Sequence, residues 1–332
     1  MSEIAIYSGS TVIYWSSIII ALGIAAWFCL SYALYTANGG RGAAMWIFLP
    51  IAVLLSVFFS RFLHWYCHSE MYSGMLSAIT DFSYGGYCLP GMLLGIFLAG
   101  MIVKALHLIP SAGDFFDALS PGAALGIALI RLSAFFNSSC RSTIIITDPR
   151  FQHLPLGIAV PTSTGLIEYR FATFFVQFLL MLILAVFLFV FYCRRHDIPM
   201  KRGLQRGNTA LIFLLFYNAM EIVMDSTRYD SSFFRLNGFV SVVQIVGALT
   251  VGGILIYYSI NSVKANGFKF YHPLIWIGFA AGLGLTGYFE YLVQRHGSWF
   301  LKCYAVMTLG CILMSAAAYV SYLTVCIKKK AD

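Results

Sequence analysis

The chain has 332 residues, of which 60% are hydrophobic and only 10% are charged, and its mean hydropathy is +0.82. Too few polar residues remain to cover a water-facing surface, so the composition excludes a soluble enzyme, a disordered chain and a disulfide-stapled secreted module. It predicts an all-α polytopic membrane protein. The net charge of +8 comes from Lys and Arg that report orientation in a membrane, so it implies no nucleic-acid partner.

Nine apolar segments are long enough, or nearly so, to cross the hydrocarbon core of a bilayer, which is about 30 Å thick. In chain order they are 11–34, 46–59, 89–103, 118–136, 171–193, 208–224, 239–260, 273–293 and 304–327. The second and third are short, so we expect them to be tilted, broken or longer than these limits. The first ten residues carry Glu3 and no basic residue, unlike a cleavable signal peptide, so the first helix is expected to remain.

Basic residues predict the orientation of the helices. The strongest basic cluster lies between the fifth and sixth segments and comprises Arg194, Arg195, Lys201, Arg202 and Arg206. The positive-inside rule places this loop in the cytoplasm. Alternation then places seven further basic residues on the same side: Arg41, Lys104, Lys264, Lys269 and Lys328 to Lys330. The N-terminus and the connections 61–87, 137–169 and 225–238 are expected outside, and the C-terminus inside.

Cysteine and histidine spacing gives no sign of a metal or of another cofactor. The eight Cys form no CxxC pair, and we interpret them as mostly thiols buried in lipid. His64 and His68 have the spacing of a metal-binding pair on a helix, but no third ligand is evident, so we interpret them as ordinary interfacial residues.

Arg131 lies in the middle of the apolar segment 118–136, where a charge costs from about 2.5 to more than 10 kcal/mol. It therefore requires an anionic partner. One interpretation is a salt bridge to Glu221 or Asp225 on a neighbouring helix. The other is an anion site in which the guanidinium group binds a phosphate through two parallel hydrogen bonds. The two interpretations are compatible with each other.

Charged residues also line one face of the sixth segment. Glu221 and Asp225 are four residues apart, and Arg228 and Asp230 continue the same face into the outer turn. This pattern is typical either of ion pairs at a helix interface or of a surface that lines an internal polar site. Five arginines fall near the outward ends of different segments, which favours binding of a phospholipid headgroup over separate interfacial roles: Arg61, Arg131, Arg170, Arg228 and Arg235.

Glycines surround the start of the third segment. Gly85, Gly86, Gly91 and Gly95 accompany Pro90 there. Such a pattern allows the backbone to approach a ligand closely. The spacing of Gly91 and Gly95 is equally typical of tight helix packing.

In this order, these features resemble the bacterial prolipoprotein diacylglyceryl transferase family. Residues 117–137, which include Asp117, Arg131 and Asn137, are similar to the family's aspartate, proline and GRxGNFxN stretch. Residues 217–230, followed by Ser241 and Gln244, are similar to its acidic-x-x-Arg-x-Asp segment and its later Ser-x-x-Gln helix. Arg61, Gly91 and Arg170 fit positions between these motifs. The resemblance covers about residues 12 to 262 and leaves the last two helices outside it.

The resemblance implies a seven-helix membrane domain at 1–263 and an additional helix pair with a basic tail at 264–332. It implies a bacterial inner-membrane enzyme that moves a diacylglyceryl group from phosphatidylglycerol to a cysteine thiol on a prolipoprotein signal helix. Arg131 would stabilise the departing phosphate, and Glu221 or Asp225 would act as base. The remaining residues are expected to bind lipid or substrate: Arg61, Gly91, Asn137, Arg170, Arg228, Asp230, Ser241 and Gln244.

The chain departs from the family at several site positions. Pro90 stands where the family has a functional His, Ala134 and Ser139 replace two further residues of its motif, and Glu221 stands at its second functional Arg. A catalytically silent member that binds phospholipid or a signal helix is therefore the alternative. A transporter is less favoured, because the charges gather at the outer end of the bundle and do not thread across it.

Overall fold

The computed structural model describes residues 4–8, 11–81, 86–137, 142–162, 165–195, 206–229, 231, 233, 238–296 and 300–326. Its long helices are α1 (Trp15–Ala37), α2 (Gly42–Cys67), α4 (Leu89–Ala105), α5 (Ala112–Ser133), α6 (Thr173–Arg194), α8 (Asn208–Ser226), α9 (Val242–Asn266), α10 (Tyr271–His296) and α11 (Phe300–Cys326). Each predicted apolar segment falls on one of them, which confirms an all-α polytopic membrane protein. Within the described part of the chain, seven helices are long and apolar enough to span a membrane, while α4 is shorter and α10 is less apolar.

The starts of two predicted segments were wrong. Residues 11–14, expected to be helical, form strand β2 (Thr11–Tyr14), which pairs with β1 (Ile4–Ser8) in an antiparallel hairpin. Phe171 ends strand β4 (Ile167–Phe171), which pairs with β3 (Gly157–Pro161) before α6 begins. Hydropathy does not separate a short apolar strand from the start of a helix, which explains both errors. The second predicted segment, 46–59, lies within α2, which is longer at both ends, as expected.

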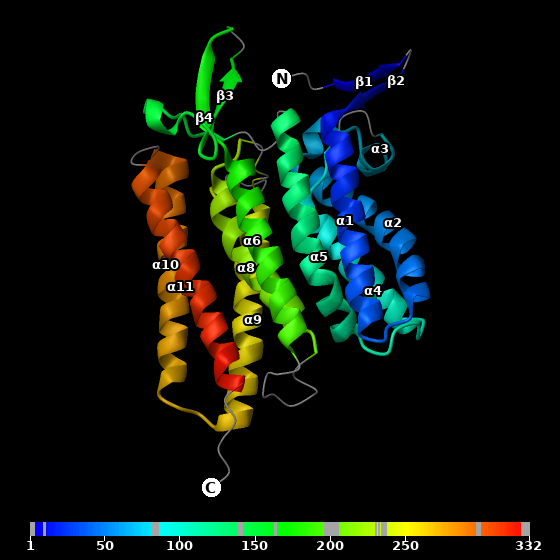
Figure 1. Cartoon of the computed structure of the whole chain (residues 1–332). Helices are drawn as coiled ribbons and strands as arrows, with labels where there is room; N and C mark the ends of the chain where they lie inside the picture. The colour runs from blue at the N-terminus through cyan, green and yellow to red at the C-terminus, as the bar shows by residue number, and fades with distance from the viewer. Residues whose placement is uncertain are drawn as a thin grey trace.

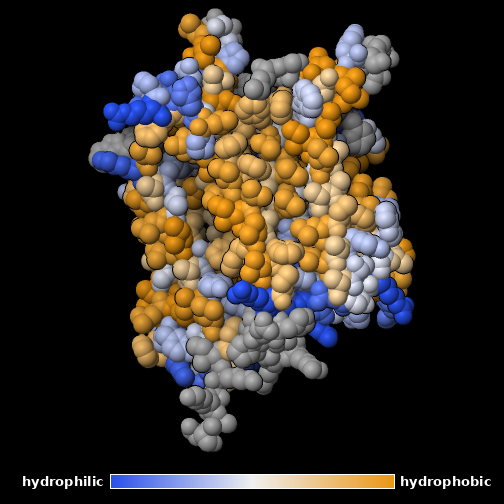
Figure 2. Space-filling model, in the orientation of Figure 1, coloured by the Kyte–Doolittle hydropathy of each residue, from blue (hydrophilic) through white to orange (hydrophobic). Residues whose placement is uncertain are grey.

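The helices run alternately between two ends of the bundle (Figure 1). Both β-hairpins lie at one end, which we call the hairpin end, together with the short helix α3 (Met75–Thr80) and the 3₁₀ turns Ser69–Met71, Ala134–Phe136 and Pro149–Phe151. The opposite end, where α1, α4, α6, α9 and α11 finish, carries Arg41, Lys104 and Lys264, and we call it the basic end. Figure 2 shows a broad apolar belt between the two ends, as expected for a surface that faces lipid.

Two buried apolar clusters hold the bundle together. One lies among α1, α2, α4 and α5 and includes Phe48 and Phe115, whose rings meet edge to face with centroids 5.0 Å apart. The other joins α5, α6 and α8 to α11 and includes Met181, Leu255 and Met307. Helix α5 contributes to both clusters and is the central element. Helices α10 and α11 share the second core with α8 and α9, while the expected domain division at residue 263 stays a prediction.

Close packing explains the glycines of α4. A Cβ atom on Gly91 would lie 2.4 Å from the carbonyl oxygen of Phe59, and one on Gly95 would lie 2.4 Å from the backbone nitrogen of Ser56. Only glycine permits this separation between α4 and α2. Ser60 reinforces the contact, because its hydroxyl donates to the carbonyl of Cys88 at 3.0 Å and accepts from the Cys88 amide at 2.7 Å.

Candidate polar site at the hairpin end

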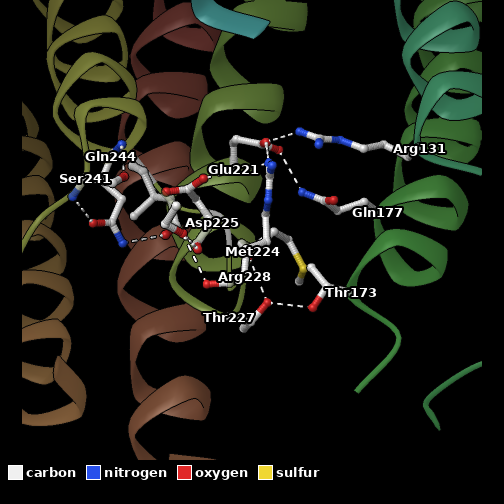
Figure 3. Close-up of polar contacts among 12 residues, drawn as sticks. Arg131, Thr173, Gln177, Glu221, Met224, Asp225, Thr227, Arg228, Ser241 and Gln244 are labelled. Atoms are coloured by element: carbon white, nitrogen blue, oxygen red, sulfur yellow. Dashed lines mark hydrogen bonds and ion pairs between the residues drawn. The ribbon is translucent and has the colours of Figure 1, made fainter. Parts of the chain in front are cut away.

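A buried ion pair joins α5 to α8 near the hairpin end. Nη2 of Arg131 donates to Oε1 of Glu221, and the two side chains are only 7% and 3% exposed. Nε2 of Gln177 on α6 donates to the other carboxylate oxygen of Glu221 at 3.0 Å. The predicted salt bridge of Arg131 is therefore present, and three helices meet at one carboxylate. Figure 3 shows Arg131 and Gln177 approaching Glu221 from the same side.

Arg228 adds a second guanidinium group to this carboxylate. Its Nη1 lies 3.7 Å from Oε1 of Glu221 and 3.8 Å from Oδ1 of Asp225. Asp225 is 1% exposed, and its Oδ2 has no hydrogen-bond partner among the described residues. Charges buried at this depth must be paired or bound to a ligand, because transfer of a charged group out of water is costly. The polar cluster thus consists of Arg131, Arg228, Glu221 and Asp225. Oδ2 of Asp225 can still accept a hydrogen bond from a ligand.

The first turn of α9 borders the same cluster. Ser241 and Gln244 form a capping box: the Gln244 amide donates to Oγ of Ser241 at 3.1 Å, and the Ser241 amide donates to Oε1 of Gln244 at 2.9 Å. Nε2 of Gln244 donates to the carbonyl of Ile222 at 3.0 Å. The two predicted residues therefore fix the start of α9 against α8, beside Asp225.

The segment after α5 connects the cluster to the second β-hairpin. Ser142 pairs with Arg228 in an isolated antiparallel bridge, and its hydroxyl donates to the carbonyl of Thr227 at 2.9 Å. Arg170 on β4 donates to the carbonyl of Ser142 at 3.2 Å and forms an ion pair with Glu168 at 2.9 Å. The predicted Arg170 is thus linked to Arg228 through Ser142 and remains outside the buried cluster.

The other predicted site residues lie in different surroundings. Arg61 is 1% exposed and donates to the carbonyls of Ala78, at 2.7 Å, and of Asp81 and Gly86, so it anchors the connection after α2. Gly91 is explained by helix packing. Asn137 follows the 3₁₀ turn after α5, six residues beyond Arg131. Asp230 and Gly85, like Ser139 and Arg235, lie outside the described residues.

Sequence reasoning missed three polar residues of this region. Gln177 on α6 is fully buried, and its Oε1 has no hydrogen-bond partner in the described structure. The hydroxyl group of Thr173, also on α6, lies 2.7 Å from that of Thr227. Glu290 on α10 is 2% exposed. Each is a polar residue in an otherwise apolar segment, and that signal was available, but the sequence did not show which helices face one another.

Two adjoining apolar pockets lie beside α4 and α5. One, of about 160 Å³, lies among α1, α2, α4 and α5 and is lined in part by Ile130, the residue next to Arg131. The other, of about 520 Å³, lies among α4, α5, α8 and α9. Trp27, Leu93, Ile96 and Ala123 line both, so the pockets adjoin. The polar cluster and the apolar space therefore lie close together along α5, an arrangement that suits an amphiphilic ligand.

The described residues include no group of three or more His, Cys, Asp or Glu side chains placed to hold a metal ion. His64 and His68 stack with ring centroids 4.5 Å apart, and the hydroxyl of Tyr72 lies 3.0 Å from Nδ1 of His64. The histidine pair is thus part of the packing at the hairpin end. The charged groups available to a substrate are the guanidinium and carboxylate groups of the polar cluster.

Comparison with known proteins agrees with these observations. A search of the curated proteins finds no match. The family model described as prolipoprotein diacylglyceryl transferase matches residues 3–258, which include α1 to α8, most of α9 and the polar cluster, while Glu290 lies beyond the match. The protein spans the membrane several times, and its last two helices lie beyond the family match. The chain therefore belongs to the prolipoprotein diacylglyceryl transferase family.

Proposed function

We propose that the protein transfers a diacylglyceryl group from phosphatidylglycerol to the cysteine thiol of a prolipoprotein signal helix, with glycerol phosphate as the leaving group. The observation that carries the proposal is the convergence of Arg131 and Arg228 on one buried carboxylate, Glu221. Two guanidinium groups at one depth provide the positive charge that a departing phosphate requires.

Glu221 holds the two arginines in position before the lipid binds. Without it, two cations would be buried with too little compensation, which is strongly destabilising. A phosphate group that enters the cluster would share the guanidinium donors with Glu221. Because the transition state carries more negative charge on the leaving oxygen than the bound lipid does, the arginines stabilise it preferentially.

The adjoining apolar pockets fit the other half of the substrate. The smaller pocket reaches Ile130, next to Arg131, and the larger one continues between α4 and α9. An acyl chain in this space would leave its glycerol backbone near the polar cluster. The short helix α4, packed against α2 through Gly91 and Gly95, forms one wall of both pockets.

A catalytically silent member that binds phospholipid is the second candidate function. The direct contact of Glu221 with Arg131 favours it. The carboxylate of Glu221 already neutralises part of the positive charge of Arg131 that would otherwise stabilise a phosphate. The two candidates agree on lipid binding and differ only in whether a thioether is formed.

The test uses purified protein in nanodiscs with a synthetic peptide that carries a lipobox cysteine. Mass spectrometry measures the diacylglyceryl adduct on the peptide, and a coupled assay measures free glycerol phosphate. We expect both products with phosphatidylglycerol and neither with phosphatidylethanolamine, while Arg206→Ala at the basic end serves as a control with normal activity. Binding of phosphatidylglycerol without either product would establish the silent member instead.

For orientation, we propose a bacterial inner membrane with the hairpin end outside and the basic end in the cytoplasm. The support is the positive-inside rule applied to the cluster at 194–206, because the connections and tail at that end carry 12 of the 21 Lys and Arg residues. Single cysteines introduced near Lys201 and in the 137–169 connection of a cysteine-free variant test it. A membrane-impermeant maleimide applied to intact cells should label only the second position, and labelling near Lys201 would reverse the topology.

A further inference from the structure

Helix α10, which lies beyond the family match, carries a buried acid that the polar cluster does not explain. Glu290 is 2% exposed. Its Oε1 accepts from Nε2 of Gln294 at 3.1 Å, whereas its Oε2 has no hydrogen-bond partner among the described residues. A buried carboxylate oxygen without a partner is costly in an apolar bundle, so its retention requires an explanation.

The surroundings of Glu290 belong to the polar site. Ser226 at the end of α8 and Gln244 in the first turn of α9 lie beside its carboxylate, and Asp225 is near enough to interact electrostatically. Helix α11 meets the same place, because the hydroxyl of Tyr304 donates to the carbonyl of Ser226 at 3.1 Å. The C-terminal helix pair therefore closes the side of the site that faces away from α5.

The three carboxylates of this region differ in their cationic neighbours. Glu221 contacts Arg131 and Arg228, and Asp225 lies within 3.8 Å of Arg228. Glu290 forms no ion pair with any described residue. An adjacent guanidinium group weakens a carboxylate as a proton acceptor, since it stabilises the charged form. Glu290 is thus the carboxylate of the site best suited to accept a proton.

We propose that Glu290 is the general base of the transfer reaction and takes the proton from the substrate thiol. This inference rests on the proposed function. The S–H proton passes to Glu290 as the sulfur forms a bond to the terminal glyceryl carbon. The bond between that carbon and the phosphate oxygen breaks, and its electron pair leaves with glycerol phosphate, beside Arg131 and Arg228. The proton on Glu290 then passes to the leaving phosphate or to water, which restores the carboxylate.

The assignment supplies the function that Pro90 leaves open, since this chain has no His at the family's position before the third helix. It also gives α10 and α11 a role in the chemistry. The titratable groups that face Glu290 are Asp225 on α8 and Tyr304 and Cys311 on α11.

The test compares Glu290→Gln with Glu70→Gln, an exposed glutamate on the 3₁₀ turn Ser69–Met71 that serves as the matched control. Three quantities are measured for each protein in phosphatidylglycerol nanodiscs: the transfer rate, lipid binding and the thermal midpoint. We expect Glu290→Gln to fold and to bind lipid within about twofold of the wild type, and to transfer about 10²- to 10⁴-fold more slowly. Glu70→Gln should match the wild type in all three.

The pH dependence separates a base from a structural tether. Without an internal base, the rate should rise about tenfold per pH unit toward the ordinary thiol pKa of about 8.5, because thiolate then comes from solution. The wild-type rate should be nearly flat over the same range. If Glu290→Gln does not fold, Glu290→Asp decides: slower transfer whose rate rises more steeply with pH than that of the wild type supports the base, and an unchanged rate and pH profile overturns it.

The outcomes also separate this inference from the proposed function. Wild-type transfer together with full transfer by folded Glu290→Gln would overturn the role of Glu290 and leave the transferase intact. A wild-type protein that binds phosphatidylglycerol and releases no glycerol phosphate would instead overturn the transferase, whatever Glu290 does.

Discussion

Buried carboxylates lie at both ends of the bundle, and their hydrogen-bonding capacity is satisfied to different degrees. At the basic end, Asp117 is fully buried, and both of its oxygens accept backbone hydrogen bonds at the start of α8, from Gly207 at 2.8 Å and from Ala210 at 3.0 Å. At the hairpin end, Asp225 and Glu290 each keep one oxygen without a hydrogen-bond partner in the described structure. The first arrangement is a closed helix cap, and the second has capacity for a ligand or a proton.

The same distinction separates two buried arginines. Arg61 donates to three backbone carbonyls and lies 5.4 Å from the ring centroid of Tyr87, so its hydrogen bonds hold a connection in place. Arg131 contacts a carboxylate that Arg228 also approaches. Burial alone therefore does not identify a functional charge. The type of partner identifies it. Backbone carbonyls carry no net charge, whereas an anionic substrate can displace a carboxylate that two arginines share.

The largest effect is expected from Arg131→Ala, because it leaves Glu221 buried with one cation fewer. We expect the free energy of unfolding in detergent to fall by about 3–5 kcal/mol and lipid binding to be nearly lost. Arg131→Lys keeps the charge without the planar guanidinium group, so both losses should be partial.

A second change tests whether the lost stability comes from the stranded carboxylate. Adding Glu221→Gln to Arg131→Ala should restore most of the stability but not lipid binding or transfer. An Arg131→Ala protein with wild-type stability and full phosphatidylglycerol binding would contradict both the ion pair's importance and the phosphate role.

The matching change at the basic end should affect stability alone. Asp117→Ala leaves the backbone donors of Gly207 and Ala210 without acceptors and removes the carboxylate that lies 3.9 Å from the buried Arg195. The two donors alone should cost about 3 kcal/mol, at roughly 1–3 kcal/mol each. Transfer per folded molecule should be unchanged, because the polar cluster lies at the other end. Asp117→Asn, which retains one acceptor oxygen, should cost less. Unfolding and transfer rates measured on the same preparations test the contrast.

A smaller loss is expected where α6 meets the end of α8. Thr173→Val removes the 2.7 Å contact between the two threonine hydroxyls, while Thr227 still donates to the carbonyl of Met224 at 2.8 Å. One buried hydrogen bond is worth about 1 kcal/mol. Thermal unfolding measures the change, with Thr250→Val as the control, since the hydroxyl of Thr250 donates to the carbonyl of Val246 within its own helix. Equal stability of the two variants would show that the Thr173 contact contributes nothing.

The sequence predicted the helices and a salt bridge from Arg131 to Glu221 or Asp225, because a charge in an apolar segment has few permitted partners, and the structure shows Glu221 as the partner. Hydropathy could not predict the strand at 11–14, since a short apolar run is compatible with either conformation. It also gave no indication that Arg61 binds backbone carbonyls. Gln177 and Glu290 were not recognised because their roles depend on which helices adjoin α8, and periodicity describes one helix at a time.

The smallest effects should come from two partly exposed ion pairs, one at each end of the bundle. Arg206 and Asp114 lie 3.1 Å apart at the basic end, and Arg170 and Glu168 lie 2.9 Å apart on the second hairpin. Solvent-exposed pairs contribute about 0–1 kcal/mol, so Arg206→Ala should leave stability and transfer nearly unchanged.

Arg170 differs, because it also donates to the carbonyl of Ser142, which pairs with Arg228. We expect Arg170→Ala to weaken phosphatidylglycerol binding by about twofold to threefold, equivalent to less than about 1 kcal/mol. Glu168→Gln, which removes the ion pair and leaves the Ser142 contact, should bind lipid normally. Equal lipid binding by the Arg170→Ala and Arg206→Ala proteins would show that the connection from the hairpin to Arg228 has no effect on the site.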